Sequence, residues 1–443
     1  MKEKPEEKLV HVCPVCGSDR LEYRFVAAGR AISACSECGH LFSNPQDSAG
    51  VLFQSSSDSD ALRRFAENQG FRGIEIIKVS GWDENRSEAE SSNRPAGFAE
   101  AVMLEGLDAS AEPEALLCSV HSLLKENGRL LLYVPVLDSK NARREKQNWE
   151  PFLQRRLHFF SLKSLQNLLC KCGFGEIALQ TAGADGVFAS CRRTVLREKR
   201  LLSFIIPVYN EKNTVRQLLD SVAGKDLSAL NLEKELIIVE SNSTDGTREE
   251  VIRFAAEHPE VRVIYEEKPQ GKGHAVRNGF AAAAGDFITI QDGDLEYDIN
   301  DYDKLLIPLV RYQEAFVLGS RHTGDWHMRK FGEGEKLRAF IMNLGQILFT
   351  GLINFGCGTR LKDPFTMFKL FRRECLYGLT FDGNRFEIDW EIIIKLIRKG
   401  FVPREIPINY VSRGKKEGKK VRMIQDPLLW IRCFVRYRYF YKI

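Results

Sequence analysis

The sequence predicts an α/β protein in which a large domain built on a parallel sheet follows a small metal-binding module. Short apolar strands alternate with helices between Leu201 and Gln291, and such alternation is typical of strands that run parallel in one sheet. The polar loops of this stretch follow strands, which is where parallel sheets bind their ligands. Near the start, two C-x2-C pairs predict the separate metal-binding module. A length of 443 residues is enough for two or three domains.

The composition is that of a globular protein, with 44% hydrophobic and 28% charged residues. The net charge of +4 is close to balance, which disfavours a nucleic-acid-binding protein, although residues 411–443 hold ten Lys or Arg and only two acidic residues. The chain opens with charged residues, and the apolar segment typical of a secretory signal does not follow. Eleven cysteines in such a chain predict reduced thiols, metal ligation and a cytoplasmic location.

The cysteine pairs predict a zinc ribbon at residues 1–46. Eighteen residues separate the two pairs, and a glycine after each pair allows the backbone to turn tightly. Four thiolates fill the tetrahedral coordination of one Zn²⁺, so we expect a structural metal with no open position for chemistry. His40 follows the second pair and is expected to pack rather than to bind the metal. The four ligands are Cys13, Cys16, Cys35 and Cys38.

Residues 47–191 predict a second α/β region, which is irregular at first and becomes regular from Phe98 onward. Its apolar run Arg129–Val134 reads as a buried strand that ends at Pro135. We expect a strand at 74–79, a helix at 114–125 broken by Gly128, a strand at 129–134 and a helix at 162–171 ended by Gly173.

Two stretches of this region, "LLKENGRLLLYVPV" and "NWEPFLQRRLHFFSLKSLQNLLCKCGF", resemble the C-terminal half of class I S-adenosylmethionine-dependent methyltransferases. The zinc ribbon is likewise similar to the one that precedes such domains in sugar C-methyltransferases. The family's Gly-rich cofactor turn does not occur between Gly39 and Phe98, and Glu105-Gly106 stand where the family usually has Glu-His. We therefore expect a degenerate domain that does not bind S-adenosylmethionine, with residual methyl transfer as the alternative.

A linker at residues 192–200 leads into the largest domain, which we place at residues 201–426. The apolar run Leu201–Pro207 is its first strand. The expected elements are strands at 201–207, 236–240, 261–265 and 287–291, with helices at 214–222, 248–257 and 274–284.

The strand at 287–291 runs directly into three acidic residues, Asp292, Asp294 and Glu296. Side chains two residues apart on an extended or tightly turned backbone point the same way. Asp292 and Asp294 can therefore bind one hard divalent cation, Mg²⁺ or Mn²⁺, and Glu296 can complete or orient its shell. Substrate phosphate oxygens and water supply the other ligands of such a cation, which suits an enzyme that neutralises a departing diphosphate.

The motifs "PVYNE", "VESNSTDGT", "GKGHAVRNGF" and "IQDGDLEYD" occur in this order and resemble family 2 glycosyltransferases, which have the nucleotide-diphospho-sugar transferase (GT-A) fold. The resemblance implies an inverting hexosyltransferase with a nucleoside diphosphate sugar as donor, and it places Glu296 where dolichyl-phosphate mannose synthases have a third metal ligand. Glu240-Ser241 stand where many relatives have two aspartates, so the base stays open between uracil and guanine. The residues that the resemblance assigns to donor binding are Pro207, Tyr209, Glu211, Glu240, Asn242, Lys272, Arg277 and Asp292.

We expect polyprenyl phosphate as the acceptor, with a saccharide hydroxyl in cell-surface polysaccharide synthesis as the alternative. The segment "EIPINYVSRGKKEGKK" looks like the C-terminal signature of the polyprenyl-phosphate-linked branch, where basic residues meet phosphates. Arg321 and Arg413 are the expected phosphate contacts, and Asp294 acts on the leaving group. A hydroxyl acceptor would need a general base, for which Asp389 is the best candidate, with Glu387 behind it.

Two later segments predict contact with a membrane surface. Ala339–Thr359 has no charged residue but holds several glycines and amides, so we expect a membrane-apposed or buried hairpin rather than a spanning helix. The tail at 427–443 mixes aromatic and basic residues, which suits a helix at an anionic membrane interface or one packed on the catalytic domain. We therefore expect a peripheral protein on the inner face of the membrane.

Overall fold

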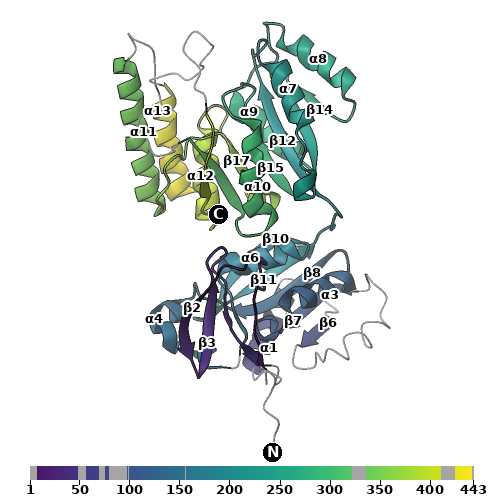
Figure 1. Cartoon of the computed structure of the whole chain (residues 1–443), viewed down its shortest axis with the longest axis vertical. Coiled ribbons are helices and arrows are strands. Elements are labelled where there is room, and N and C mark those ends of the chain that lie inside the picture. Colours follow the sequence, from purple (N-terminus) through teal and green to yellow (C-terminus); the bar gives the residue numbers. More distant parts are fainter. Residues whose placement is uncertain are drawn as a thin grey trace, which may run out of the picture. The chain divides into compact units, whose positions relative to one another are not determined.

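The structure is a computed structural model, and it describes residues 7–47, 56–68, 75–78, 97, 99–154, 156–321, 336–410 and 425–441 (Figure 1). The chain divides into two compact units. The first extends to Leu196 and includes Arg311–Gln313, and the second contains the rest of the chain. Each unit has its own sheets and its own hydrophobic core.

The cysteine-rich segment of the first unit forms an antiparallel sheet with the order β2-β3-β4-β9. Strand β9 comes from the middle region, and its His158 pairs with Phe42 of β4. The predicted boundary at residue 46 therefore falls inside one compact unit. His40 is fully buried and packs on Phe160 with 4.8 Å between the ring centroids, as expected for a packing residue. The strands are β1 (Glu7–Lys8), β2 (Leu21–Ala27), β3 (Arg30–Cys35), β4 (Leu41–Ser43), β5 (Gln46–Asp47) and β9 (His158–Phe159).

The second sheet of this unit has the order β10-β11-β8-β7-β6, in which β6, β7 and β8 run parallel and the other pairs are antiparallel. The helix predicted at 162–171 is confirmed as α6. The helix predicted at 114–125 ends earlier, at Leu123, and Gly128 lies within β8 instead of breaking a helix. A Cβ at Gly128 would lie 2.8 Å from the Lys125 carbonyl oxygen, so close backbone approach explains the glycine. The remaining elements are α1 (Ser56–Asn68), β6 (Glu75–Lys78), β7 (Ala99–Glu105), α3 (Pro113–Leu123), β8 (Leu124–Pro135), α4 (Lys140–Glu145), α5 (Glu150–Leu153), α6 (Leu162–Lys171), β10 (Phe174–Ala182) and β11 (Gly186–Arg193).

The second unit is built on a seven-stranded sheet with the order β14-β13-β12-β15-β17-β16-β18. The four strands predicted from the sequence run parallel as expected, but β17 is antiparallel to both of its neighbours, so the sheet is mixed. The elements are β12 (Arg200–Val208), α7 (Val215–Gly224), β13 (Leu232–Glu240), α8 (Thr247–Glu257), β14 (Arg262–Tyr265), α9 (Lys272–Ala282), β15 (Phe287–Ile290), α10 (Tyr302–Val310), β16 (Phe316–Ser320), α11 (Lys336–Cys357), β17 (Lys369–Arg372), α12 (Ile388–Arg398), β18 (Arg404–Pro407), α13 (Gln425–Val435) and the π-helical turn η8 (Arg436–Phe440).

The hairpin expected at 339–359 is wrong, because this segment up to Cys357 belongs to the single helix α11. One of its glycines serves packing: a Cβ at Gly356 would lie 2.1 Å from the ring of Phe434 on α13. Helices α11 and α13 lie side by side in Figure 1, and Phe349 and Trp430 join them with ring centroids 5.5 Å apart. Among the described residues, no helix has the length and hydropathy that a membrane span requires.

Candidate active site

The polar loops of the second unit start at one edge of its sheet. In the parallel register Val208 of β12 pairs with Glu240 of β13, and Glu240 pairs with Tyr265 of β14, so these three strands end at the same level. The Gln291 amide, just after β15, donates to the Ile205 carbonyl at 2.9 Å and fixes the end of this strand beside β12. The side chains that follow these strands are therefore brought together, as parallel order predicts.

The turn after β12 is bonded to the loops after β13 and β15. Asn210 has a φ of +50°, in the left-handed region, and its Oδ1 accepts a hydrogen bond from the Thr244 amide at 2.9 Å. The Thr214 hydroxyl lies 3.1 Å from the Gly293 carbonyl oxygen and 3.4 Å from Oε2 of Glu211. Three of the sequence motifs thus form one hydrogen-bonded framework. This turn carries the predicted donor-binding residues Pro207, Tyr209 and Glu211, all of them half-buried.

The loop after β13 is held by its own acidic residue. Glu240 is fully buried, and its Oε1 accepts from the Ser243 amide at 2.7 Å. Arg248 on α8 lies with its Nε 3.5 Å from Oε2 of Glu240, and its Nη1 donates to Oδ1 of Asn242 at 2.8 Å. The guanidinium also stacks over Tyr265, 5.0 Å from the ring centroid. Arg248 was not predicted from the sequence; its place in the first turn of the helix after the loop is the only local signal.

The centre of the site is a set of two carboxylates and two lysines that comes from four separate segments. Lys272 at the start of α9 donates to Oδ1 of Asp292, and both side chains are only 17% exposed. Nζ of Lys369 on β17 lies 3.6 Å from Oδ1 of Asp389 on α12, and both residues are buried. The sequence did not single out Lys369, although a lysine in an apolar strand is a signal of a buried ion pair.

The electrostatics link these four groups into one cluster. Burial lowers the pKa of Lys272, but Asp292 and Asp389 outweigh it and the pKa is raised overall. Burial also raises the pKa of Asp389 above its ordinary value, against the opposing effect of Lys369 and Lys272. The pKa of Lys369 is lowered, mainly by burial. The charges of Lys272 and Asp292 therefore both affect the pKa of Asp389, even though nearly one hundred residues separate Asp389 from Asp292 in the chain.

The three acidic residues after β15 have different hydrogen-bond partners. Oδ1 of Asp294 accepts from the Glu296 amide at 3.2 Å. Oε2 of Glu296 accepts from the Tyr410 hydroxyl at 2.6 Å. Among the described residues, the cysteine cluster near the start is the one group of three or more ligand atoms close enough to hold a metal ion. Tyr410 thus orients Glu296, two residues after Asp294 in the chain.

The structure describes the contacts of some of the residues expected to bind the acceptor. Arg321 is buried in a bidentate ion pair with Asp363, with Nε and Nη2 each 2.8 Å from a carboxylate oxygen, and it stacks on Tyr410 at 5.2 Å. Arg413 lies outside the described residues. Oε1 of Glu387 accepts from the amides of Asn384 and Arg385, in the turn just before α12.

The start of α9 fits closely against the segment before α12. Gly271 has a φ of +103°, and a Cβ there would lie 2.3 Å from the Asn384 carbonyl oxygen, so the position requires glycine. A Cβ at Gly273 would lie 2.4 Å from the Gly383 carbonyl oxygen. Arg277, expected near the nucleotide, donates to the carbonyl of Phe381 at 3.2 Å and to the Asn384 side chain.

Two family models match the chain. The model described as Glycosyl transferase family 2 matches residues 203–379, and the model described as Methyltransferase domain matches residues 59–178. A dolichol-phosphate mannosyltransferase of Saccharomyces cerevisiae is 33% identical over 235 residues, which cover 49% of this chain and 82% of that protein. The chain belongs to glycosyltransferase family 2. Both matches fall within the predicted regions 201–426 and 47–191 and confirm the two resemblances at the level of family.

This family 2 chain has relatives of differing length. A dolichol-phosphate mannosyltransferase of Pyrococcus furiosus is 29% identical over 218 residues, which are 49% of this chain and 58% of that protein. The chain therefore spans little more than half the length of this relative. Among solved structures, glucosyl-3-phosphoglycerate synthase from Mycobacterium tuberculosis in complex with Mg²⁺ and UDP aligns at 20% identity and a TM-score of 0.39, covering 54% of this chain and 79% of its own.

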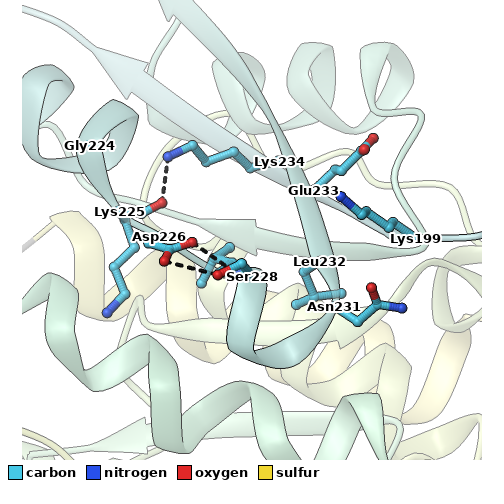
Figure 2. A pocket seen from close by; sticks show the side chains of 10 residues that line it. Lys199, Gly224, Lys225, Asp226, Ser228, Asn231, Leu232, Glu233 and Lys234 are labelled. Carbon is cyan, nitrogen blue, oxygen red and sulfur yellow. Dashed lines mark hydrogen bonds between the residues drawn. The ribbon is translucent and has the colours of Figure 1, made fainter.

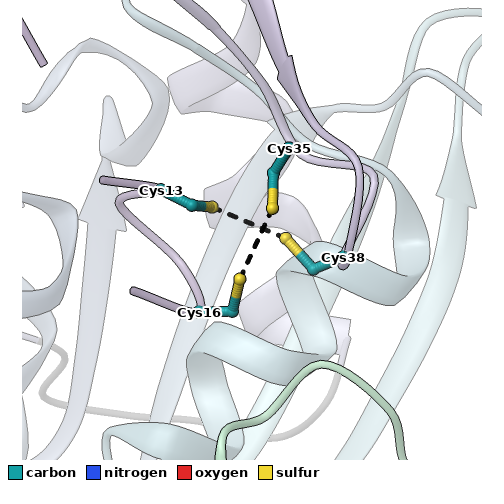
Figure 3. A group of neighbouring side chains, drawn as sticks. All are labelled: Cys13, Cys16, Cys35 and Cys38. Atoms are coloured by element: carbon teal, nitrogen blue, oxygen red, sulfur yellow. Dashed lines mark hydrogen bonds between the residues drawn. The ribbon is translucent and has the colours of Figure 1, made fainter. Parts of the chain in front are cut away.

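The first unit of the family 2 chain gathers its four predicted metal ligands at one point (Figure 3). Sγ of Cys13 lies 3.5 Å from Sγ of Cys38, and Sγ of Cys16 lies 3.6 Å from Sγ of Cys35. Thiolates at the corners of a tetrahedron around Zn²⁺ are about 3.8 Å apart, given a Zn–S distance of about 2.3 Å. All four cysteines are buried, so the set fits one closed tetrahedral metal site.

A pocket of about 530 Å³ lies at the opposite edge of the glycosyltransferase sheet, where β12 and β13 begin (Figure 2). Lys234 in this pocket donates to the carbonyls of Val222, Ala223 and Lys225, which end helix α7. Lys225 in turn pairs with Asp303 at 2.8 Å. Lys234 and Lys225 therefore stabilise the fold through these contacts, and we do not consider this pocket a candidate active site.

Proposed function

We propose that this protein transfers a sugar from a nucleoside diphosphate sugar to polyprenyl phosphate, with inversion at the anomeric carbon and with the help of Mg²⁺ or Mn²⁺. The observation that carries the proposal is the carboxylate pair Asp292 and Asp294, which follows β15 beside the motif loops of β12 and β13, with Lys272 bonded to the first carboxylate. An anionic diphosphate bound at this edge meets a lysine and a pair of metal-binding carboxylates.

The donor set suits a hard divalent cation. Carboxylate oxygens are the ligands that Mg²⁺ and Mn²⁺ prefer, and Asp292 and Asp294 supply them next to a site for phosphate oxygens. When bound, the ion neutralises the charge that develops on the departing diphosphate. Lys272 contributes a second positive charge at the same place, and its raised pKa keeps it protonated at neutral pH. Asp292 and Asp294 are assigned to the ion, and Glu296, held by the Tyr410 hydroxyl, completes or orients its shell.

A phosphate acceptor is favoured over a hydroxyl acceptor by the state of Asp389. A general base must reach the hydroxyl whose proton it removes, whereas a phosphate is already anionic at neutral pH. Asp389 is only 8% exposed and faces Lys369, so we assign it to holding the lysines in place. Relatives named as dolichol-phosphate mannosyltransferases and dolichyl-phosphate β-glucosyltransferases support this choice of acceptor. Transfer to a saccharide hydroxyl remains the alternative function.

The outer faces of α11 and α13 support attachment to the membrane in which such an acceptor would lie, on its cytoplasmic side. Phe355 on α11 is 90% exposed and Leu428 on α13 is 63% exposed. Exposed apolar side chains at helical spacing, next to basic residues, are typical of helices that lie in a lipid interface. The exposed apolar and aromatic residues of these elements and of η8 are Leu344, Ile347, Leu348, Phe355, Leu428, Ile431, Val435, Tyr439 and Phe440.

We further propose that the four cysteines hold a structural Zn²⁺ and that the methyltransferase-like region does not bind S-adenosylmethionine. Cys13, Cys16, Cys35 and Cys38 surround one point at tetrahedral spacing, which favours a closed site. The zinc then stabilises the first unit and has no part in sugar transfer.

A panel of UDP- and GDP-sugars, incubated with the purified protein and either polyprenyl phosphate or soluble glycans, tests the proposed function. The expected result is a lipid-linked sugar that forms only when polyprenyl phosphate is present. In the same assay, Asp389→Asn should reduce turnover only mildly. A soluble glycan product together with a loss of about 100-fold or more in Asp389→Asn would support the hydroxyl acceptor and reject the lipid phosphate.

A further inference from the structure

The end of the described chain is bonded to the segment just before α12. Nη2 of Arg436 lies 2.6 Å from Oδ2 of Asp382, and the Tyr437 hydroxyl donates to the same oxygen at 3.3 Å. The Tyr441 hydroxyl accepts from the Thr380 amide at 3.3 Å and lies 3.1 Å from the Thr380 hydroxyl. We call these five residues the tail clamp.

A buried ion pair on α12 is hydrogen-bonded to the same segment. Glu391 and Lys395 on α12 are both fully buried and bonded to each other. Oε1 of Glu391 accepts from the Asp382 amide at 2.9 Å, and Oε2 accepts from the Gly383 amide at 2.7 Å. The ammonium of Lys395 also lies 3.9 Å from the ring centroid of Tyr441, so the ion pair and the tail clamp share their contacts.

The segment bound by the clamp packs against the start of α9. The Asn384 carbonyl accepts from the His274 amide at 3.2 Å, and Arg277 donates to the Asn384 side chain. Nζ of Lys272 lies 5.8 Å from the ring centroid of Phe386, which follows this segment directly. The segment thus packs against the first turn of α9, and these contacts position the Lys272 side chain that is bonded to Asp292.

We propose that the tail clamp is a positioning device for donor binding: it holds residues 380–386 against α9 and so keeps Lys272 in place for the diphosphate. The proposal rests on the proposed function, and it adds residues that none of the sequence motifs includes. Three residues of the clamp, Arg436, Tyr437 and Tyr441, follow α13 directly in the chain, so the same C-terminal segment carries an exposed apolar face and sets the geometry of the donor site.

The test uses the full-length protein and two sets of substitutions. The clamp variant is Arg436→Gln, Tyr437→Phe and Tyr441→Phe together, which removes the polar contacts and keeps the rings around Lys395. The matched control is Arg432→Gln with Tyr439→Phe, which changes an exposed cation and an exposed tyrosine of the same elements. Calorimetry with GDP and with UDP, each with Mn²⁺, measures donor-site binding directly.

We expect the clamp variant to bind the preferred nucleotide about fivefold more weakly, since the polar contacts of three side chains are lost. The KM for the nucleotide sugar should rise by the same factor, with the KM for polyprenyl phosphate and the melting temperature close to those of the control. Gly271→Ala pushes on the same segment from the α9 side, so it should weaken nucleotide binding too, and less than additively with the clamp variant.

The proposal is overturned if the wild type binds nucleotide and the clamp variant binds it equally tightly. A rise in both KM values together with a lower melting temperature would also overturn it, because that pattern marks a purely structural role. If the wild-type protein binds neither nucleotide, the proposed function fails and the clamp fails with it.

Discussion

Replacing Lys272 with methionine removes the positive charge at the centre of the candidate site. Lys272 and Asp292 are each 17% exposed, between an exposed ion pair and a fully buried one. Exposed pairs contribute about 0–1 kcal/mol and loss of one buried partner costs about 3–5 kcal/mol, so we expect Lys272→Met to lower the free energy of unfolding by about 2 kcal/mol. The pKa of Asp389 should rise further, since one of its two lysine neighbours is lost.

The same substitution should weaken nucleotide binding. A charge-assisted contact between lysine and phosphate contributes about 1.5–3 kcal/mol, which corresponds to a Kd for GDP or UDP about 10- to 100-fold higher. Denaturant unfolding and calorimetry measure the two effects, and Lys268→Met, a change at an exposed lysine of the preceding loop, is the matched control. A Lys272→Met protein that is as stable as this control and binds nucleotide as tightly would refute the assigned role.

The remaining predictions concern pH, metal, membrane and cofactor. The native state binds more protons than the unfolded state between pH 3.8 and the raised pKa of Asp389, so stability should fall as the pH rises through this window, and Asp389→Asn should abolish this slope in pH-dependent unfolding. Metal analysis should find one zinc per chain, lost in Cys35→Ser. Phe355→Ser should reduce sedimentation with anionic vesicles while Ile252→Ser, an exposed change on α8, should not. Calorimetry with S-adenosylmethionine should give no binding heat, whereas micromolar affinity would contradict the prediction that residues 47–191 form a degenerate domain that does not bind this cofactor.

Local signals were enough to predict the motif loops and the strands that carry them. The strands at 201–207 and 287–291 are mostly apolar and end in polar turns, so their type and their common edge follow from the sequence. The same holds for the two cysteine pairs, whose spacing alone indicates one metal site. In these places, the residues that form the element also form the site.

Contacts between distant segments could not be predicted in this way. Lys369 reaches Asp389 only because β17 inserts antiparallel between β15 and β16, and no local pattern reveals that order. The bidentate pair between Arg321 and Asp363 likewise depends on tertiary packing. The predicted hairpin at 339–359 failed because glycine was read as a turn signal, whereas Gly356 makes room for Phe434.

The most direct test of the proposed mechanism is the rate at which wild-type protein and Asp294→Ala form lipid-linked sugar, each with Mn²⁺ and with EDTA. We predict product from the wild type with Mn²⁺, reversible loss in EDTA, and a loss of about 100-fold or more in Asp294→Ala, because this carboxylate acts on the leaving diphosphate. Far-ultraviolet circular dichroism of the variant should match the wild type. Full turnover by correctly folded Asp294→Ala in EDTA would contradict the account.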